Sequence, residues 1–436
     1  MSSTASPTLN SLFQKSHRVH EYTEPDQVVP MKVLFKDEKY TAETIDILSQ
    51  IAKDAKLDHF VPQVVIGDQL SCKNIRGSKL WRQAEVEEID TLKWANETPG
   101  DFHFLWTCLR TVFTKFWGCP AHSGTLCNMR EVTRRTSVDK NVKVFNVCDE
   151  FLVHAFKGHL ISGVLTYFKA KSPADLIEHS ATERWLQETA DTLVSKTLMP
   201  SNSTDPVYKM HRSFLHHAFL YIDVREAIRW ENGQQIVRHW KYWLPHFLAE
   251  GCTNYAVEAV HVISNLIASF PKHIAYIATH NRTVNMTGRP GRAKPIDQLM
   301  EHYNLIFKQT LRTSGGNLTP QHVEDVSLAV LFLMEAAKRV DTVLGASRQS
   351  TSHTVRDASQ DILKIAKDLT DRKTTEEVPS RSSPVHSDNS EVGWKKLTTT
   401  SWLKDVLSKK AHLQVDETDI STQREVASDY ELSDVI

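Results

Sequence analysis

The feature that most constrains the fold of this chain is a long succession of amphipathic helical segments. Between Asp149 and Leu344, apolar residues recur at the three- and four-residue spacing of helices that bury one face. Stretches rich in proline, glycine, serine or asparagine separate these runs and mark their ends. The expected helices cover residues 149–170, 182–198, 206–230, 233–249, 254–269, 296–312 and 320–344. The sequence therefore predicts a predominantly helical protein.

The amino-terminal third differs, because it contains short apolar runs that are typical of strands. Strands are expected at residues 63–66 and 142–147, and residues 28–35 indicate a further strand or extended segment. Helices are expected between them, at residues 41–57, 74–85 and 104–117. We therefore predict an α/β fold that is mainly helical, with a small sheet in the amino-terminal third and a large helical region after it.

Changes in composition predict three regions along the chain. Residues 1–27 are polar and aperiodic, which indicates a disordered leader. Residues 28–345 are expected to form a single domain, with a strand-containing part at 28–148 and a helical part at 149–345. Serine, threonine, aspartate and lysine dominate residues 346–436, which are predicted to be a disordered polar tail. Short helices at 354–369 and 401–410 are an alternative within that tail.

Composition also excludes several classes of protein. No apolar run approaches the roughly 18 residues of a membrane-spanning helix, and the amino terminus lacks the apolar core of a signal peptide. We therefore expect an intracellular protein, nuclear or cytoplasmic and not secreted, without a membrane partner.

The formal net charge of -1 means that nucleic-acid binding would require a local basic patch. The cysteines form no CxxC pair and are expected to be free thiols; a zinc site at Cys119, His122 and Cys127 matches no common ligand spacing.

Two acidic residues follow probable extended segments and precede helices. Asp68 follows the apolar run that ends at Gly67, and Asp101 lies in the segment PGDFH. In α/β proteins such positions lie at the carboxyl ends of neighbouring strands, so we expect Asp68 and Asp101 at the same end of one small sheet. The alternative for each is a helix N-cap, a position that aspartate favours.

A third carboxylate lies on the helix expected at residues 254–269. Glu258, His261 and Asn265 fall on a face that is distinct from the apolar stripe of this helix. Glu258 can therefore face a site within the protein, and an ordinary solvated glutamate is the alternative.

A glycine-containing loop precedes the helix expected at residues 296–312. Its cations are Arg282, Arg289, Arg292 and Lys294. Pro295 fits the first turn of the following helix, so the loop would present cations and free backbone N–H groups to phosphates. A solvated surface loop is the alternative. Lys73 and Arg76, on the basic helix near residues 74–85, are further candidates for nucleic-acid contacts.

Two carboxylates on the helix expected at residues 296–312 are one turn apart. Asp297 and Glu301 stand at i and i+4, where like charges repel unless a cation or a metal lies between them. Neutralisation by Lys294 or Lys308 is the expected arrangement.

Several segments taken together resemble those of a known family. They read GDQLSCKNIRGSKLWRQ, PGDFHFLW, FNVCDEFLVHA, NYAVEAVH and VNMTGRPGRAKPIDQLMEHYNLIFK. The chain resembles an uncharacterised domain family of animals and fungi that is widespread in transposon-derived genes, and the resemblance covers most of residues 28–345. Such genes are similar in organisation to DDE-type transposases. Those enzymes use three carboxylates on a ribonuclease-H-like fold to hold two divalent ions that cleave or join DNA strands.

The resemblance implies a role for particular residues. Asp68, Asp101 and Glu258 would be the catalytic and metal-ligating carboxylates, with His103 as a neighbouring metal or phosphate contact. The cofactor would be Mg²⁺ or Mn²⁺ and the partner DNA. The small sheet would then be a degenerate ribonuclease-H-like core.

Two departures from the family pattern count against the nuclease activity that the resemblance implies. Only about 33 residues separate Asp68 from Asp101, which is short for the strands of such a core. Longer members also carry an upstream segment with an aspartate, so a truncated or domesticated remnant is an alternative. The rival from another class is a non-enzymatic helical scaffold for protein partners. Clustered carboxylates would favour the nuclease, and a carboxylate buried against an arginine would favour the scaffold.

Overall fold

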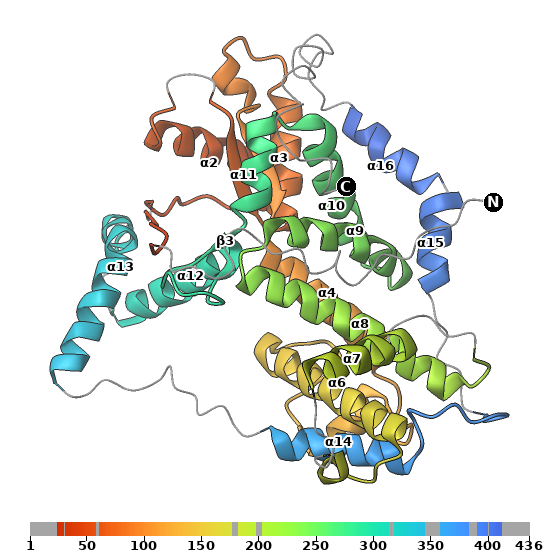
Figure 1. Ribbon diagram of the computed structural model, residues 1–436. Helices are drawn as coiled ribbons and strands as arrows, with labels where there is room; N and C mark the ends of the chain where they lie inside the picture. Colours follow the sequence, from red (N-terminus) through yellow and green to blue (C-terminus); the bar gives the residue numbers. More distant parts are fainter. Residues whose placement is uncertain are drawn as a thin grey trace.

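Helices dominate the computed structural model of the chain (Figure 1). The structure describes residues 24–29, 31–57, 61–176, 182–197, 203–313, 315, 318–344, 358–382, 390–399 and 401–411. Within these residues the strands form only small sheets, one of them near the amino terminus, which confirms the predicted fold class. No helix in this described part of the chain is long and apolar enough to cross a membrane.

The small amino-terminal sheet consists of two parallel strands. β1 (Gln63–Gly67) pairs with β2 (Ala95–Pro99), so that Gly67 lies opposite Pro99. A parallel pair needs a crossover connection, and here α3 (Gln69–Trp81) and the turn η1 (Glu88–Thr91) provide it. A separate small core packs α2 (Thr41–Asp54) against α3 and β2; it includes Ile45, Leu48, Ile75, Leu92 and Trp94.

The main hydrophobic core is formed by long helices. They are α4 (Asp101–Phe116), α6 (Phe145–Phe168), α8 (Pro206–Arg229), α9 (Gly233–Ala249) and α10 (Thr253–Ser264). Aromatic contacts link them: the Phe104 ring stacks on Trp240 with 4.0 Å between centroids. Because α4 begins immediately after β2, it connects the strand ends directly to this helical core.

The helical segments predicted from periodicity are present with small shifts of their ends. The remaining elements are α5 (Leu126–Thr133), η2 (Pro173–Leu176), α7 (Glu183–Thr197), the π-helical turn η3 (Asn265–Ser269), α11 (Lys272–His280), β3 (Thr283–Val284), β4 (Lys294–Pro295), α12 (Ile296–Thr313) and α13 (Pro320–Val343).

The strand predicted at 142–147 is wrong, because α6 already begins at Phe145 and carries that apolar run into the helical core. The described residues of 28–35 form no strand, although the Val33 N–H donates to Ser327 Oγ at 3.0 Å.

Parts of the tail after residue 345 are ordered, and the alternative of short helices within the tail is correct for α14 (Ser359–Asp371) and α16 (Trp402–Ala411). α14 (Ser359–Asp371) packs along α6, and its Ile365 and Leu369 are fully buried in the main core. The helices approach closely because α6 has Gly158 at the contact, where a Cβ would lie 2.5 Å from Ile365 Cγ2. α15 (Ser390–Thr399) packs on α9, and α16 (Trp402–Ala411) follows it. A few apolar residues at helical spacing are therefore enough to order a segment whose overall composition is polar.

Some predicted segments lie outside the described residues. These are residues 1–23 of the expected leader and, in the expected tail, residues 346–357, 383–389, 400 and 412–436. Of the leader, Asp26 is described and makes contacts, because its N–H donates to the Asn285 carbonyl oxygen at 3.1 Å.

Candidate functional site

Asp68 and Asp101 lie at the same end of the parallel sheet, as predicted. Asp68 directly follows β1, and Asp101 lies two residues beyond the last residue of β2. The Gly100 N–H donates to the Gly67 carbonyl oxygen at 2.8 Å and joins the two strand ends. Asp68 is also the N-cap of α3, because its Oδ1 accepts a hydrogen bond from the N–H of Ser71 at 2.7 Å. For Asp68 the N-cap alternative is therefore correct.

Asp101 is buried in an ion pair with Arg282. Arg282 donates from Nε to Oδ2 and from Nη2 to Oδ1, both at 2.8 Å, and the Trp240 Nε1–H donates to Oδ1 at 3.1 Å. Burial raises the pKa of Asp101, and the charge of Arg282 opposes that rise. Arg282 also donates to the Pro99 carbonyl oxygen at 2.8 Å. The guanidinium therefore links the end of β2 to the start of α4.

Glu258 is buried in a second ion pair, with Arg76 of α3. Arg76 donates from Nη1 to Oε2 at 3.1 Å and from Nη2 to Oε1, so both carboxylate oxygens are occupied. Glu97 of β2 lies 3.9 Å from the same guanidinium and pairs with Lys79 at 2.5 Å. Burial raises the pKa of Glu258, and Arg76 opposes the rise. This second ion pair joins α10 to α3 beside the sheet.

The predicted carboxylates do not form a donor set that fits a pair of divalent ions. Two-metal sites need carboxylate oxygens that reach ions roughly 3.5–4 Å apart. Arg282 and Arg76 instead occupy both oxygens of Asp101 and Glu258, so of the three predicted carboxylates only Asp68 is not held by an arginine. No group of three or more His, Cys, Asp or Glu side chains within the described ranges could hold a metal ion. The catalytic and metal roles inferred from the resemblance stay predictions.

His103 is the side chain that contacts two carboxylates at the strand ends. Its Nδ1 lies 3.1 Å from Asp297 Oδ2, and its Nε2 lies 3.2 Å from Glu301 Oε1. The hydrogen bond to Asp297 raises the pKa of His103 above its usual value, and the charges of Glu301 and Asp68 act in the same direction. The side chain between Asp297 and Glu301 is therefore His103, which is a cation when its ring is protonated, rather than the lysines expected from the sequence.

Asp297 also caps α4 from a distant part of the chain. Its carboxylate accepts hydrogen bonds from the N–H groups of Phe102, at 3.0 and 3.1 Å, and of His103, at 3.1 Å. The N-cap position itself is Gly100, so the prediction of Asp101 as the N-cap is wrong. Glycine is required there, because a Cβ at Gly100 would overlap the Asp297 carboxylate. Nothing in a single sequence pairs Asp297 with residues so far away.

The predicted nucleic-acid contacts fall into two groups. The guanidinium groups of Arg282 and Arg76 are held in the ion pairs described above. Lys73, Arg289, Arg292 and Lys294 are exposed. None of the ion pairs among the described residues involves these four side chains. Of the six predicted nucleic-acid contacts, four side chains are therefore exposed and available to a partner.

The loop that carries the exposed cations is held in shape. β3 and β4 pair in antiparallel fashion at its base, with Val284 opposite Lys294. Asn285 is buried; its Oδ1 accepts from the Thr287 N–H at 3.2 Å, and its Nδ2 donates to the Arg289 carbonyl oxygen at 3.0 Å. Gly291 has a φ of 70° and lies against the Trp230 ring. The backbone conformation is thus set by internal contacts, while the cationic side chains point to solvent.

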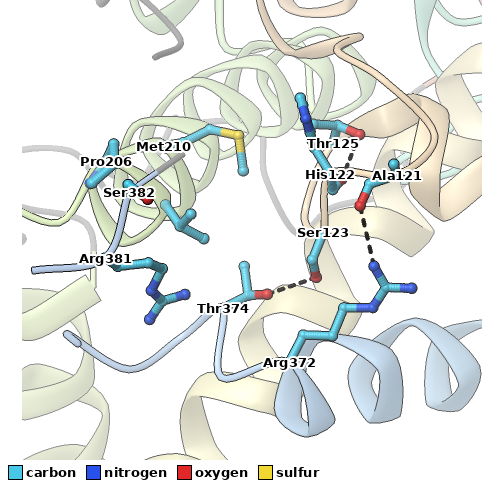
Figure 2. Close-up of a pocket in the computed structure, with 11 residues that line it drawn as sticks. Ala121, His122, Ser123, Thr125, Pro206, Met210, Arg372, Thr374, Arg381 and Ser382 are labelled. Carbon is cyan, nitrogen blue, oxygen red and sulfur yellow. Dashed lines mark hydrogen bonds between the residues drawn. The ribbon is translucent and has the colours of Figure 1, made fainter. Parts of the chain in front are cut away.

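A separate pocket of about 230 Å³ lies between the start of α8, the loop before α5 and the turn after α14 (Figure 2). Its polar wall includes Ser123, Thr374, Arg372 and Arg381. Arg372 pairs with Asp368 and Arg381 with Asp205, each at 3.0 Å. Because each guanidinium has its own carboxylate, the wall has no unbalanced positive charge that would select an anion.

Comparison with known proteins identifies the family but not an activity. Residues 3–353 match DUF6589, a family of unknown function. The chain belongs to this family. No curated protein and no solved structure gives a match. The matched region of this DUF6589 protein ends before α14, although α14 completes the main core.

Proposed function

We propose that this DUF6589 protein binds nucleic acid without cleaving it. In this proposal it is a transposon-derived relative of DDE-type nucleases in which arginines neutralise two of the inherited carboxylates. The observation that carries the binding proposal is the β3–β4 loop. It holds Arg289, Arg292 and Lys294 exposed on a backbone that internal contacts keep in one shape.

The geometry of the loop suits phosphate contacts. Gly288 and Gly291 have φ values of 64° and 70°, which glycine adopts without strain, so the loop can turn tightly between its cations. Both glycines are buried, so the phosphate contacts would be made by the exposed cationic side chains. A loop whose shape is already fixed by internal contacts loses little conformational entropy when it meets a ligand that fits that shape. The loop also lies immediately before α12, whose amino-terminal end contributes a positive partial charge.

The arrangement at the strand ends supports binding rather than cleavage. Metal-assisted phosphodiester cleavage requires carboxylate oxygens that are free to ligate ions. Asp101 and Glu258 each give both oxygens to an arginine. The same two ion pairs favour the second candidate function, a non-enzymatic scaffold for protein partners, and the binding experiment distinguishes the two.

The test is fluorescence anisotropy with labelled duplexes of unrelated sequence across a salt series. Phosphate contacts release counterions, so log affinity should fall linearly with log salt concentration, by roughly 0.9 per phosphate contacted. The double variant R289A/R292A should weaken binding to every duplex about equally and reduce the salt slope by about 2.

The matched control is K395A/K404A, which removes two exposed cations from α15 and α16, on the far side of the molecule from α12 in Figure 1. This control should keep the wild-type affinity and slope. Equal losses in both double variants would indicate a diffuse charge effect. An absence of binding by the wild-type protein would overturn the proposal and leave the scaffold.

A cleavage assay completes the test. With Mg²⁺ or Mn²⁺ present, we expect the bound duplexes to remain intact. Cleavage that D68N, D101N and E258Q each abolish, with circular dichroism like that of the wild type, would show that these carboxylates act in catalysis and that Asp101 and Glu258 leave their arginines.

A further inference from the structure

α13 presents an apolar stripe to solvent. Its exposed apolar residues are Phe332, 75% exposed, Val343, 86%, and Val340, 54%, together with Leu328, Leu333 and the C-cap residue Leu344. At 100° per residue these side chains occupy one stripe roughly 160° wide, with Ala336 near its centre. Apolar surface of this extent on a single helix usually marks an interaction site.

The other faces of α13 already have neighbours. α12 packs against α13, and Val326 and Val330 are buried. On another side, Ser327 Oγ accepts a hydrogen bond from the Val33 N–H, and Glu324 pairs with Lys32 at 3.5 Å. In Figure 1, α13 lies at the edge of the molecule beyond α12. The apolar stripe is thus the face that the described residues leave uncovered.

We propose that α13 pairs with α13 of a second copy of this chain, in antiparallel orientation about a twofold axis near Ala336.

The order of apolar residues along the stripe suits such an axis. Phe332 and Val340 lie four residues before and after Ala336, and Leu328 and Leu344 lie eight residues before and after it. A twofold rotation through Ala336 therefore places Phe332 of one copy level with Val340 of the other. The small side chain of Ala336 allows the helices to approach at the crossing point. A twofold interface uses the same patch on both copies, so this internal symmetry is what it requires.

Charge on one edge of the stripe identifies the second copy and its direction. Glu335 and Arg339 lie on the same edge, paired at 3.1 Å and mostly exposed. In an antiparallel twofold pair, this edge of one helix meets the same edge of the other. Glu335 of each copy then lies within reach of Arg339 of the other. In a parallel pair, the edge that carries Glu335 and Arg339 would instead face the opposite edge of the partner's apolar stripe.

The first experiment is sedimentation velocity of the full chain from about 1 to 200 µM, a range chosen because an interface of one helix pair is small and weak. We expect a concentration-dependent dimer. F332E and V343E should each remain monomeric across the range, and circular dichroism should be unchanged because both side chains are largely exposed. The control V86E alters an apolar residue that is 96% exposed elsewhere and should dimerise like the wild type.

Several outcomes would overturn the proposal. A wild-type protein that stays monomeric at the highest concentration would show that the stripe is solvated, covered by another part of the chain or reserved for a different partner. A dimer that survives both F332E and V343E would place the interface elsewhere.

The second experiment tests the direction of pairing. E335R and R339E should each dimerise several-fold more weakly than the wild type, because like charges then face one another across the axis. An equimolar mixture of the two variants should form heterodimers more tightly than either variant alone, as measured by native mass spectrometry. A mixture that associates no better than the separate variants would overturn the antiparallel arrangement.

Discussion

Two pairs of arginines that look alike in the sequence have opposite environments in the fold. Arg282 and Arg76 lie beneath packed helices, and each binds both oxygens of a buried carboxylate. Arg289 and Arg292 lie on a loop and are exposed. The comparison shows that packing over the side chain, and not residue type, decides whether a cation stabilises the fold or is available to a partner.

The difference has a simple energetic basis. A buried charge that loses its partner leaves the other charge desolvated, which costs about 3–5 kcal/mol. An exposed cation is solvated with or without a partner, so its removal changes stability by less than about 0.5 kcal/mol. The predictions below test this contrast at four points.

The largest effect is expected for R282A. Removal of Arg282 strands the fully buried Asp101 carboxylate and should lower the free energy of unfolding by about 3–5 kcal/mol in urea titrations. The double variant D101A/R282A should recover part of this loss, because it leaves no unpaired charge. A loss below about 1 kcal/mol for R282A would contradict the assignment of this pair as structural.

A smaller effect is expected for R76A. The Arg76 side chain is 11% exposed, so water can partly solvate Glu258 once the arginine is gone. We expect a loss of about 2–3 kcal/mol, somewhat below the cost for a fully buried pair. A double-mutant cycle with E258A should give a coupling energy of about 1–3 kcal/mol, and additive effects would show that the two residues act independently.

A third prediction concerns pH. The pKa of His103 is raised in the fold by its hydrogen bond to Asp297, so its stabilising effect should be complete below the unfolded pKa of about 6.5. That effect should disappear as pH rises through the folded pKa. Because His103 is about one-third exposed, we expect at most about 1 kcal/mol. Urea titrations of the wild type and H103Q should therefore differ more at pH 5.5 than at pH 8.5. An equal difference at both would refute the prediction.

The smallest effect is expected for R289A/R292A. Both side chains are exposed and outside the ion pairs of the described residues, so the free energy of unfolding should change by less than about 0.5 kcal/mol. The same urea titrations provide the measurement. A loss comparable to that of R76A would mean that the loop arginines also hold the fold together.

Local patterns in the sequence predicted the parts of the fold that depend on neighbouring residues. Helical periodicity located α8, α9 and α13 closely, because each buries one face at a regular spacing. The strand run ending at Gly67 located β1 and placed Asp68 at its carboxyl end. For α14 the sequence offered a short helix at 354–369 as an alternative, but the polar composition around it gave no sign that Ile365 and Leu369 are buried in the main core.

The site depends on contacts that no local pattern contains. His103 is bracketed by Asp297 and Glu301 from a helix far along the chain. Charge repulsion at i and i+4 indicated that a group able to carry positive charge belongs between these two carboxylates, and His103 is such a group. The pattern could not say which group, because sequence distance favours lysines on or beside the same helix over a histidine on another helix.

The contacts that hold the strand ends together also have a consequence for the order of folding. The hydrogen bond that caps α4 joins residues 195 positions apart, and the two buried ion pairs span 181 and 182 positions. Contacts of such long sequence separation form slowly, because a large loop must close first. During synthesis on the ribosome, β1, β2 and α4 emerge long before α12. A nascent chain that ends before Asp297 therefore lacks the carboxylate that caps α4 at the strand ends. Such a chain should depend on chaperones until the last of these long-range partners is made.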